Sequence, residues 1–192
     1  MRYNPKFHHR RSIRLKGYDY ARPGWYFVTI CTWKRRYFFK MYPVLKKIVE
    51  QCWDEMPQRY HGVSIDEFVI MPNHLHGIIV IEEGGASKAQ NNAKAEYIAK
   101  AGARPACTAM EGAERISLGR IVGEFKSLCV HNWLAEIKRN EIGARGKFWH
   151  WNYYERIIRD ERELERVRLY IRNNPLKWEN DDLEFLGEET II

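Results

Sequence analysis

Two histidines separated by a single residue, His74 and His76, are the side chains in this sequence best suited to hold a metal ion. Alternate side chains of a β-strand point to the same face, so both imidazoles would project together while Leu75 points to the opposite face. Their Cα atoms would lie roughly 6.5–7 Å apart, which lets both rings converge on one ion. An H-x-H pair is often only the polar, solvent-facing side of a strand. Here it follows the turn residues Pro72-Asn73 and precedes the apolar run 77–81, so we expect it at the end of a rigid core strand.

Tyr170 and Asn174 place a phenol and an amide oxygen side by side on the last predicted helix. Leu164, Val167 and Ile171 define the buried stripe of that helix at 100° per residue. Residues four apart are neighbours on a helix surface, so Tyr170 and Asn174 share one flank of the stripe. The alternative is that the tyrosine is a boundary aromatic and the asparagine a helix C-cap.

Hydrophobic periodicity and β-branched content predict the elements that must position these residues. They are a strand at 25–33, a helix at 44–60, strands at 63–71 and 75–81 joined by a tight turn, a helix at 117–139, an extended aromatic segment at 148–158 and a last helix. Asp160 and Glu163 resemble a capping box at the start of that helix, and Pro175 is expected to end it at Asn173-Asn174. This order predicts an α+β fold, an antiparallel sheet with helices packed mainly on one face.

The length of 192 residues is typical of one domain. We expect a single unit with a basic N-terminal arm at 1–20 and an insertion at 83–116. The insertion is rich in Ala, Gly, Lys and Asn and has few large apolar residues, so we expect it to be mobile.

A net charge of +7 and an isoelectric point near 9.2 favour a nucleic-acid partner. The arm carries many cations and no carboxylate before residue 19, which is typical of a solvated tail or of a phosphate-contacting extension. On the predicted aromatic strand, Trp149 and Trp151 alternate with His150, and either tryptophan can stack on unpaired bases or be buried. The expected DNA contacts are Arg10, Arg11, Arg14 and Lys16 in the arm and Arg120 and Lys126 on the helix at 117–139.

The four cysteines are scattered and form no C-x-x-C pair, which argues against a zinc knuckle or a redox motif. No segment approaches the length of a membrane span, and the N-terminal residues lack the apolar core of a signal peptide. We therefore expect no membrane partner, a cytoplasmic location and reduced thiols.

The segment 71–79, MPNHLHGII, resembles the histidine–hydrophobe–histidine motif of the single-tyrosine HUH transposases. Segments 11–20, 26–32 and 170–175 are similar to one branch of these proteins, the REP-associated tyrosine transposases. The resemblance covers about residues 10–82 and 117–178, and its motifs occur in matching order.

The resemblance implies a ferredoxin-like, HUH-type sandwich and a role for each matched residue. His74 and His76 would be metal ligands with Asn174 as the third ligand, and Tyr170 would be the nucleophile. The metal would be Mg²⁺ or Mn²⁺, and the enzyme would cleave and rejoin hairpin-containing single-stranded DNA through a 5′-phosphotyrosine.

Two alternatives remain beside this interpretation. A domesticated relative would bind hairpin DNA as a regulator without cutting it, although the presence of both histidines and the tyrosine argues against decay. A metal-dependent hydrolase unrelated to nucleic acid would fit the histidines but not the basic arm. The resemblance favours a monomer, with a homodimer as the alternative.

Overall fold

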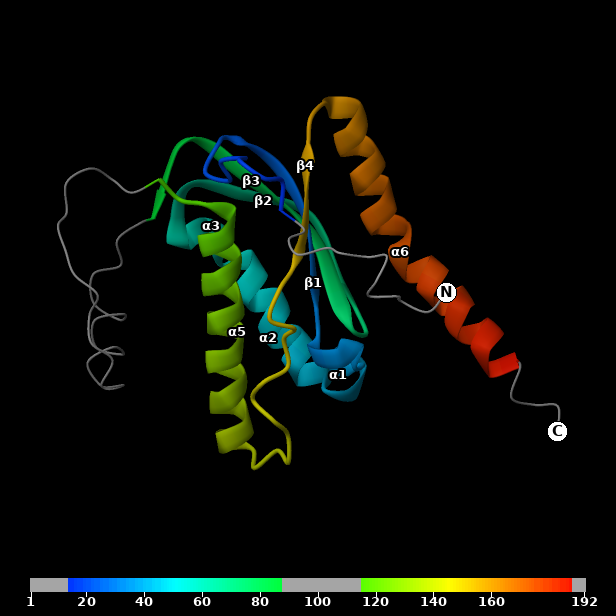
Figure 1. The fold of residues 1–192 in the computed structure, drawn as a ribbon. Helices are drawn as coiled ribbons and strands as arrows, with labels where there is room; N and C mark the ends of the chain where they lie inside the picture. Colours follow the sequence, from blue (N-terminus) through cyan, green and yellow to red (C-terminus); the bar gives the residue numbers. More distant parts are fainter. Residues whose placement is uncertain (1–13, 88–114, 188–192) are drawn as a thin grey trace.

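The computed structural model describes residues 14–87 and 115–187, with residues 177–187 described by their backbone alone. A four-stranded antiparallel sheet has the order β2-β3-β1-β4 (Figure 1). Its strands are β1 (Gly24–Cys31), β2 (Tyr60–Met71), β3 (His74–Ser87) and β4 (Tyr154–Ile158). The helices are the 3₁₀ turn η1 (Trp33–Arg35), α1 (Phe38–Met41), α2 (Pro43–Asp54), α3 (Met56–Arg59), α5 (Leu118–Arg139) and α6 (Glu161–Gly187). The predicted α+β class and the order of its main elements are confirmed.

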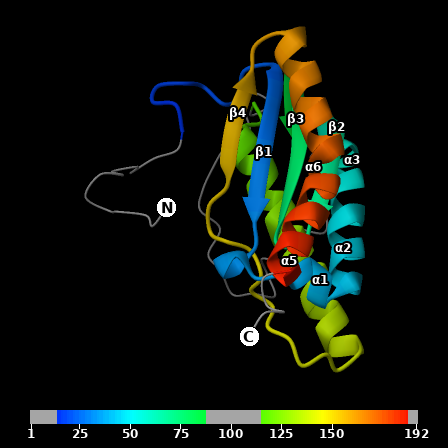
Figure 2. The ribbon, with the colours of Figure 1, turned by 90° about the vertical axis from the view of Figure 1, so that its right-hand side faces the viewer.

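The two faces of the sheet carry helices of different kinds. Figure 2 shows α6 on the near face of the sheet, with α2 and α5 behind it. Strand β1 explains this division, because its side chains alternate between the faces. Tyr26, Val28 and Ile30 are fully buried in the main core with α2 and α5, whereas Trp25 and Phe27 pack toward the smaller cluster under α6. Most of the described helices therefore cover one face, and among them α6 alone crosses the other.

Strand β3 contributes to both faces in the same way. Leu75, Ile79 and Ile81 lie in the main core, and the register across β1 places Thr29 opposite His76. Gly77 allows α2 to approach this strand closely, because a Cβ at this position would lie 2.3 Å from the ring of Trp53. The strand that carries the histidines is thus packed directly against the core helices.

Two helix starts follow the sequence signals. The Ser117 side chain accepts a hydrogen bond from the N–H of Arg120, as expected for an N-cap. At the start of α6, Asp160 Oδ1 accepts from the N–H of Glu163 at 2.7 Å, and Glu163 Oε2 accepts from the N–H of Arg159 at 3.0 Å. Asp160 therefore caps the helix as expected, whereas Glu163 bonds to the residue before the N-cap and not to Asp160 itself, so the capping box is present only in part.

Several predicted boundaries are wrong. The helix expected at 44–60 is divided into α2 and α3 and ends at Arg59, and the strand expected at 25–33 ends at Cys31. Helix α6 does not end at Asn174 but continues through Pro175 to Gly187. A proline removes one backbone hydrogen bond and disfavours a helical residue before it, yet the turns on either side keep their own bonds. The aromatic segment is a strand only from Tyr154, and before it a single bridge pairs Trp149 with Thr32.

The predicted mobile insertion overlaps the described structure at both of its ends. Strand β3 runs on to Ser87, and the N–H of Ile116 donates to the carbonyl of Gly85 at 3.1 Å. Residues 88–114 lie outside the described part of the chain. Within the described part, no helix has the length and apolar content that crossing a membrane requires.

Candidate active site

His74 and His76 begin β3 and face α6, as their alternation with Leu75 predicts. Their Nε2 atoms lie 3.0 Å apart, and their rings meet edge to face with centroids 4.6 Å apart. The turn at Pro72-Asn73 and the strand register therefore bring both imidazole tips to one point. The predicted convergence of the two rings is present in the structure.

The opposite nitrogen of each ring has its own partner. His74 Nδ1 lies 2.6 Å from Asn73 Oδ1, and His76 Nδ1 lies 2.8 Å from the hydroxyl of Thr29. The orientation of the Asn73 amide is fixed, because its Nδ2 donates to the carbonyl of Arg35 at 3.2 Å. An amide oxygen only accepts, so His74 Nδ1 donates and leaves a lone pair on Nε2. Partners of this kind orient the histidines of metal sites.

Burial keeps both imidazoles neutral. Desolvation, together with the positive charge of Arg35, lowers the pKa of His74 to about 4. Desolvation and the charge of His74 lower the pKa of His76 to about 3. At neutral pH both rings therefore have the unprotonated form that a metal ligand needs.

The spacing of the two imidazoles suits a divalent ion. Ligands at about 2.1 Å from an octahedral metal lie about 3.0 Å apart when they are adjacent, the separation of the two Nε2 atoms. Across residues 14–87 and 115–187, no cluster of three His, Cys, Asp or Glu side chains suits a metal ion. Among the described residues, a third ligand would therefore be of another residue type. Asn174, one helical turn after Tyr170 on α6, is only 9% exposed.

Tyr170 brings its phenol to the histidine pair from α6. Its Oη lies 3.3 Å from His76 Nε2, and the two rings are inclined at 65° with centroids 5.3 Å apart. Phe27 supports both, because it stacks on His76 and meets the edge of the Tyr170 ring. The side chain is 45% exposed, so an external substrate can reach the hydroxyl.

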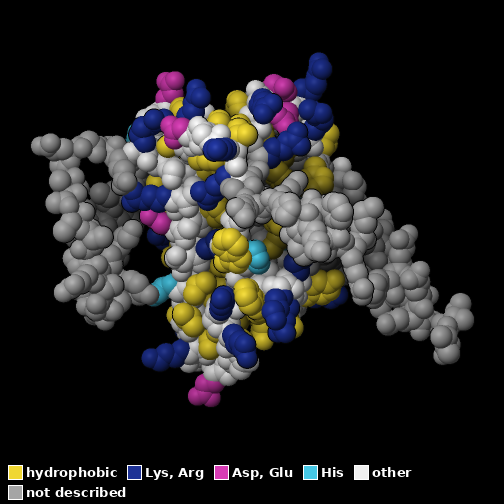
Figure 3. All heavy atoms as spheres, in the orientation of Figure 1, with side chains coloured by type: hydrophobic (Ala, Val, Ile, Leu, Met, Phe, Trp, Pro, Cys, Tyr) yellow, Lys and Arg dark blue, Asp and Glu magenta, His cyan; other side chains and the backbone are white. Residues whose placement is uncertain are grey.

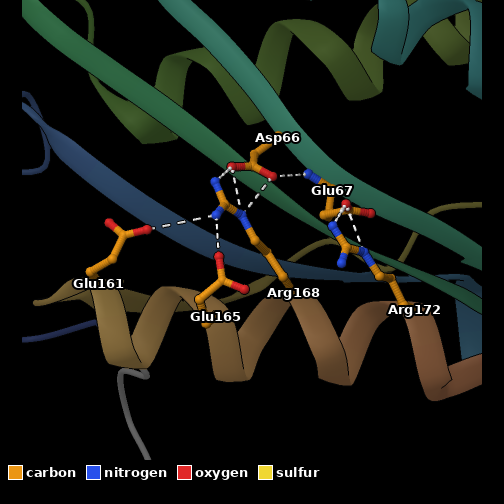
Figure 4. A network of polar contacts seen from close by, with 6 residues as sticks. All are labelled: Asp66, Glu67, Glu161, Glu165, Arg168 and Arg172. Atoms are coloured by element: carbon orange, nitrogen blue, oxygen red, sulfur yellow. Dashed lines mark hydrogen bonds and ion pairs between the residues drawn. The ribbon is translucent and has the colours of Figure 1, made fainter.

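Ion pairs between α6 and β2 hold the helix that carries this phenol (Figure 4). Arg168 Nη2 lies 2.6 Å from Asp66 Oδ2, and Arg172 pairs with Glu67. Both carboxylates stand in an irregularity of β2, where the register with β3 shifts between Ile65 and Phe68. Hydrogen bonds from Arg168 hold the pKa of Asp66 below its usual value. The two arginines flank Tyr170 in sequence, so the network positions the phenol along the sheet.

Of the residues predicted to bind DNA, those that the structure describes are not gathered at this site. Arg14 lies over the rings of Tyr20 and Tyr153 and donates to the Tyr153 hydroxyl at 2.9 Å. Arg120 pairs with Glu124, and the Lys126 ammonium donates to the backbone carbonyls of residues 150 and 151. Both belong to α5, on the far side of the sheet from the histidines. Lys16 is exposed, and Arg10 and Arg11 lie outside the described residues.

The two tryptophans before β4 have different environments. Trp149 is buried in the main core, and Trp151 is 78% exposed. Basic side chains are more widespread than acidic ones over the described surface that Figure 3 shows.

Thr29, Asn73 and Phe27 are site residues that the sequence did not identify. Thr29 is 47 residues from His76 in the chain, and the register of β1 with β3 brings both Thr29 and Phe27 to that histidine. Asn73 could have been found, because it directly precedes the first histidine. Its neighbour Arg35 was missed for the same reason as Thr29, since a loop after β1 brings it to this turn.

Comparisons with known proteins identify one relative by sequence and one solved structure with a similar fold. An uncharacterized protein of Haemophilus influenzae is 41% identical over 189 residues, which cover 95% of this chain and 97% of that protein. A solved structure of a REP-associated tyrosine transposase bound to a REP hairpin matches with a TM-score of 0.53 at 15% identity, over 85% of this chain and 73% of that chain. No family model matches the sequence. The resemblance expected from the motifs is confirmed at the level of the fold.

Proposed function

Because this chain belongs to one family with the Haemophilus influenzae protein and has the fold of the REP-associated tyrosine transposase, we propose that it is a metal-dependent DNA strand transferase. It cleaves and rejoins single-stranded DNA that carries a hairpin, through a 5′-phosphotyrosine. One observation carries the proposal, the meeting of a phenol with two neutral imidazoles. Tyr170 Oη lies 3.3 Å from His76 Nε2, which lies 3.0 Å from His74 Nε2.

His74, His76 and Asn174 are the residues that would hold the divalent ion. Two imidazoles and an amide oxygen form a mixed donor set, which suits Mn²⁺ on ligand type, with Mg²⁺ as the commoner ion in cells. When bound, the ion polarises the scissile phosphate and offsets the negative charge of the transition state. Asn73 and Thr29 orient the two rings toward it from behind.

Tyr170 supplies the nucleophile. Its Oη forms a bond to phosphorus, the bond from phosphorus to the 3′ oxygen breaks, and that oxygen takes up a proton to become a free hydroxyl. The phenol proton passes to water, which reaches the half-exposed side chain. The phosphodiester energy is kept in the phosphotyrosine, so the 3′-hydroxyl of a second strand can reverse the step without an external energy source.

The hairpin itself would contact basic residues outside this cluster. We propose the arm, with Arg10, Arg11, Arg14 and Lys16, as the first contact. Arg120 and Lys126 are candidates on the α5 face. Phosphate contacts of this kind supply affinity that falls with salt concentration.

The proposal is tested with a pool of labelled hairpin oligonucleotides whose unpaired flanks are randomised. Incubation with Mn²⁺ or Mg²⁺ should give a covalent protein–DNA adduct on a denaturing gel. Tyr170→Phe should form none. Tyr154→Phe is the matched control, because Tyr154 is similarly exposed and lies opposite Thr29 on β4, yet forms no hydrogen bond or ring contact with either histidine in the described structure.

Three results would overturn the assignment: no adduct from the wild type, an adduct from Tyr170→Phe, or equal loss in both tyrosine variants. His74→Ala should abolish the adduct while hairpin binding largely survives. Tight hairpin binding by the wild type with no adduct would instead identify a non-catalytic DNA-binding protein.

A further inference from the structure

The turn between β1 and α1 contains two residues in a conformation that their types do not favour. Lys34 has a φ of 53° and a ψ of 26°, and Arg35 has a φ of 52°, although neither is a glycine. In this left-handed region the Cβ of an L-residue lies too close to the following carbonyl oxygen, so the turn is strained. Both side chains are exposed, so their packing does not enforce the conformation. Strain of this kind persists only where surrounding contacts hold it, and it is concentrated at functional sites.

The contacts that hold the turn come largely from Thr32, whose side chain is fully buried. Its hydroxyl shares one proton between the carbonyl of Arg36 at 2.7 Å and the carbonyl of Asn73 at 2.9 Å. The N–H of Thr32 donates to the same Asn73 carbonyl at 2.9 Å, and the carbonyl of Thr32 accepts from the N–H of Arg35 at 3.1 Å. One threonine therefore joins the strained turn to the turn that precedes His74.

A further contact between the two turns decides which nitrogen of His74 carries the proton. The Arg35 carbonyl accepts from Asn73 Nδ2 at 3.2 Å, and Asn73 Oδ1 faces His74 Nδ1 at 2.6 Å. If the amide were rotated by half a turn, its oxygen would face the Arg35 carbonyl, and two acceptors would oppose each other. Its NH₂ group would then donate to His74 Nδ1, and the ring proton would move to Nε2, the atom that faces His76. The position of one backbone carbonyl therefore determines which nitrogen of His74 has a free lone pair.

We propose that the strained turn at Lys34-Arg35 is a positioning device for His74. It presents the Arg35 carbonyl to Asn73 and thereby keeps the His74 proton on Nδ1, and Thr32 is the residue that holds the turn in place. A relaxed turn would move this carbonyl and leave the Asn73 amide able to take either orientation. The inference rests on the proposed function, because a lone pair on His74 Nε2 is needed only if His74 binds the divalent ion.

The first test measures the tautomer of His74 in the full-length, metal-free protein. A long-range proton–nitrogen NMR spectrum of protein with isotope-labelled histidine, recorded with a chelator at neutral pH, separates the Nδ1–H form from the Nε2–H form, and His74→Gln assigns the signals. Wild-type His74 should carry its proton on Nδ1. Thr32→Val should give a mixture of both forms, and Thr32→Ser should recover the wild-type spectrum because it restores the hydroxyl. The signals of His76, whose Nδ1 faces Thr29, should stay the same in both variants.

Mn²⁺ affinity gives a second measurement on the same variants. Thr32→Val should bind Mn²⁺ about tenfold more weakly than the wild type by titration calorimetry, because the ring that supplies one ligand is no longer held in one form. Thr32→Ser should bind within about twofold of the wild type.

Glycine substitutions test the strain, and they remain informative if Thr32→Val does not fold. Lys34→Gly should raise the midpoint of thermal unfolding by about 2–4 °C, because glycine adopts the left-handed conformation without strain. Arg36→Gly is the matched control, since Arg36 is an exposed neighbour with a φ of −69°, where glycine only adds freedom to the unfolded chain and should lower the midpoint. Lys34→Gly combined with Arg35→Gly should weaken Mn²⁺ binding without a loss of stability, which a purely structural turn would not do.

The inference is overturned if wild-type His74 carries its proton on Nε2, or if Thr32→Val and Thr32→Ser have the same His74 spectrum and the same Mn²⁺ affinity. Equal losses of stability in Lys34→Gly and Arg36→Gly would also overturn it. The adduct assay separates these results from a failure of the proposed function. An adduct together with a His74 tautomer that does not depend on Thr32 removes the positioning device alone. A tautomer held by Thr32 without any adduct removes the proposed DNA cleavage and leaves the positioning of the ring in place.

Discussion

At the scale of single residues, the geometry of the site depends on the side chains that hydrogen-bond to the two histidines. Thr29 and Asn73 occupy the Nδ1 atoms of the two histidines, so that both Nε2 atoms point to the same place. Neither residue would touch the metal or the DNA. Their contribution is to hold two buried rings in one orientation, and partners of this kind typically change metal affinity by about 10- to 100-fold.

Replacing Thr29 should therefore weaken metal binding. Thr29→Val keeps the shape of the side chain and removes the hydroxyl that faces His76, and we expect Mn²⁺ affinity to fall about tenfold by titration calorimetry. Thr29→Ser restores the hydroxyl and should recover most of the affinity. Equal affinity in the valine and serine variants would show that the hydroxyl does not orient the ring.

The same two histidines should make the stability of the metal-free protein depend on pH. Their pKa values in the fold are about 4 and about 3, whereas an unfolded histidine has a pKa near 6.5. Between these values the unfolded chain binds more protons than the folded chain, so the free energy of unfolding falls as the pH is lowered from about 6.5 toward 4. We expect the pair to account for a loss of about 2 kcal/mol or more.

Urea unfolding at pH 7 and pH 5, with a chelator present, measures this loss. A variant with both His74→Gln and His76→Gln lacks the two titrating groups and should lose less stability over the same interval. Identical losses in the variant and the wild type would assign the pH dependence to other residues.

At the scale of elements, α6 is the part whose position decides whether the site is assembled. Arg168 joins it to Asp66 on β2, and Glu161 and Glu165 contact the same guanidinium (Figure 4). Arg168→Ala should let the helix shift on the sheet, so the rate of adduct formation should fall several-fold while the histidine pair still binds Mn²⁺. Hydrogen exchange of the α6 amides should become faster, which would report the loosened helix directly.

Arg166→Ala is the control for this change. Arg166 is exposed on the same helix, two residues away, and makes none of the ion pairs of the network. It should form the adduct at the wild-type rate. If Arg168→Ala and Arg166→Ala form the adduct equally fast, the ion pairs do not position Tyr170.

Sequence patterns predicted the helices and strands better than they predicted which residues of different elements come into contact. The alternation of β3 was readable because His74 and His76 are two residues apart, and the flank shared by Tyr170 and Asn174 follows from helix geometry. Thr29 and Arg35 were not readable, because their approach to the histidines depends on strand register and on a loop with left-handed residues. The end of α6 was misplaced because a proline disfavours helix locally, and the surrounding turns override that preference.

At the scale of the whole molecule, the structure shows a chain whose last helix packs on its own sheet (Figure 2). Under the proposed function, Tyr170 would then act on the histidines of the same chain. A mixture of Tyr170→Phe with a variant carrying His74→Ala and His76→Ala should therefore form no adduct. Recovery of activity in the mixture would show that helices are exchanged between two copies, and a dimer in solution by light scattering would accompany it.

Side chains of β3 alternate between the two faces of the sheet, and this alternation limits where residues can be inserted or deleted. Residues 74–81 carry the histidines on one face and core residues on the other, with Gly77 against Trp53. Inserting or deleting one residue there would exchange the two faces, turning imidazoles toward the core and aliphatic side chains toward the substrate. Natural and engineered variants should therefore tolerate length changes between β3 and α5. Length changes within residues 74–81 of β3 should instead abolish folding or activity. A scan of single-residue deletions, scored by soluble yield and by adduct formation, would map that boundary.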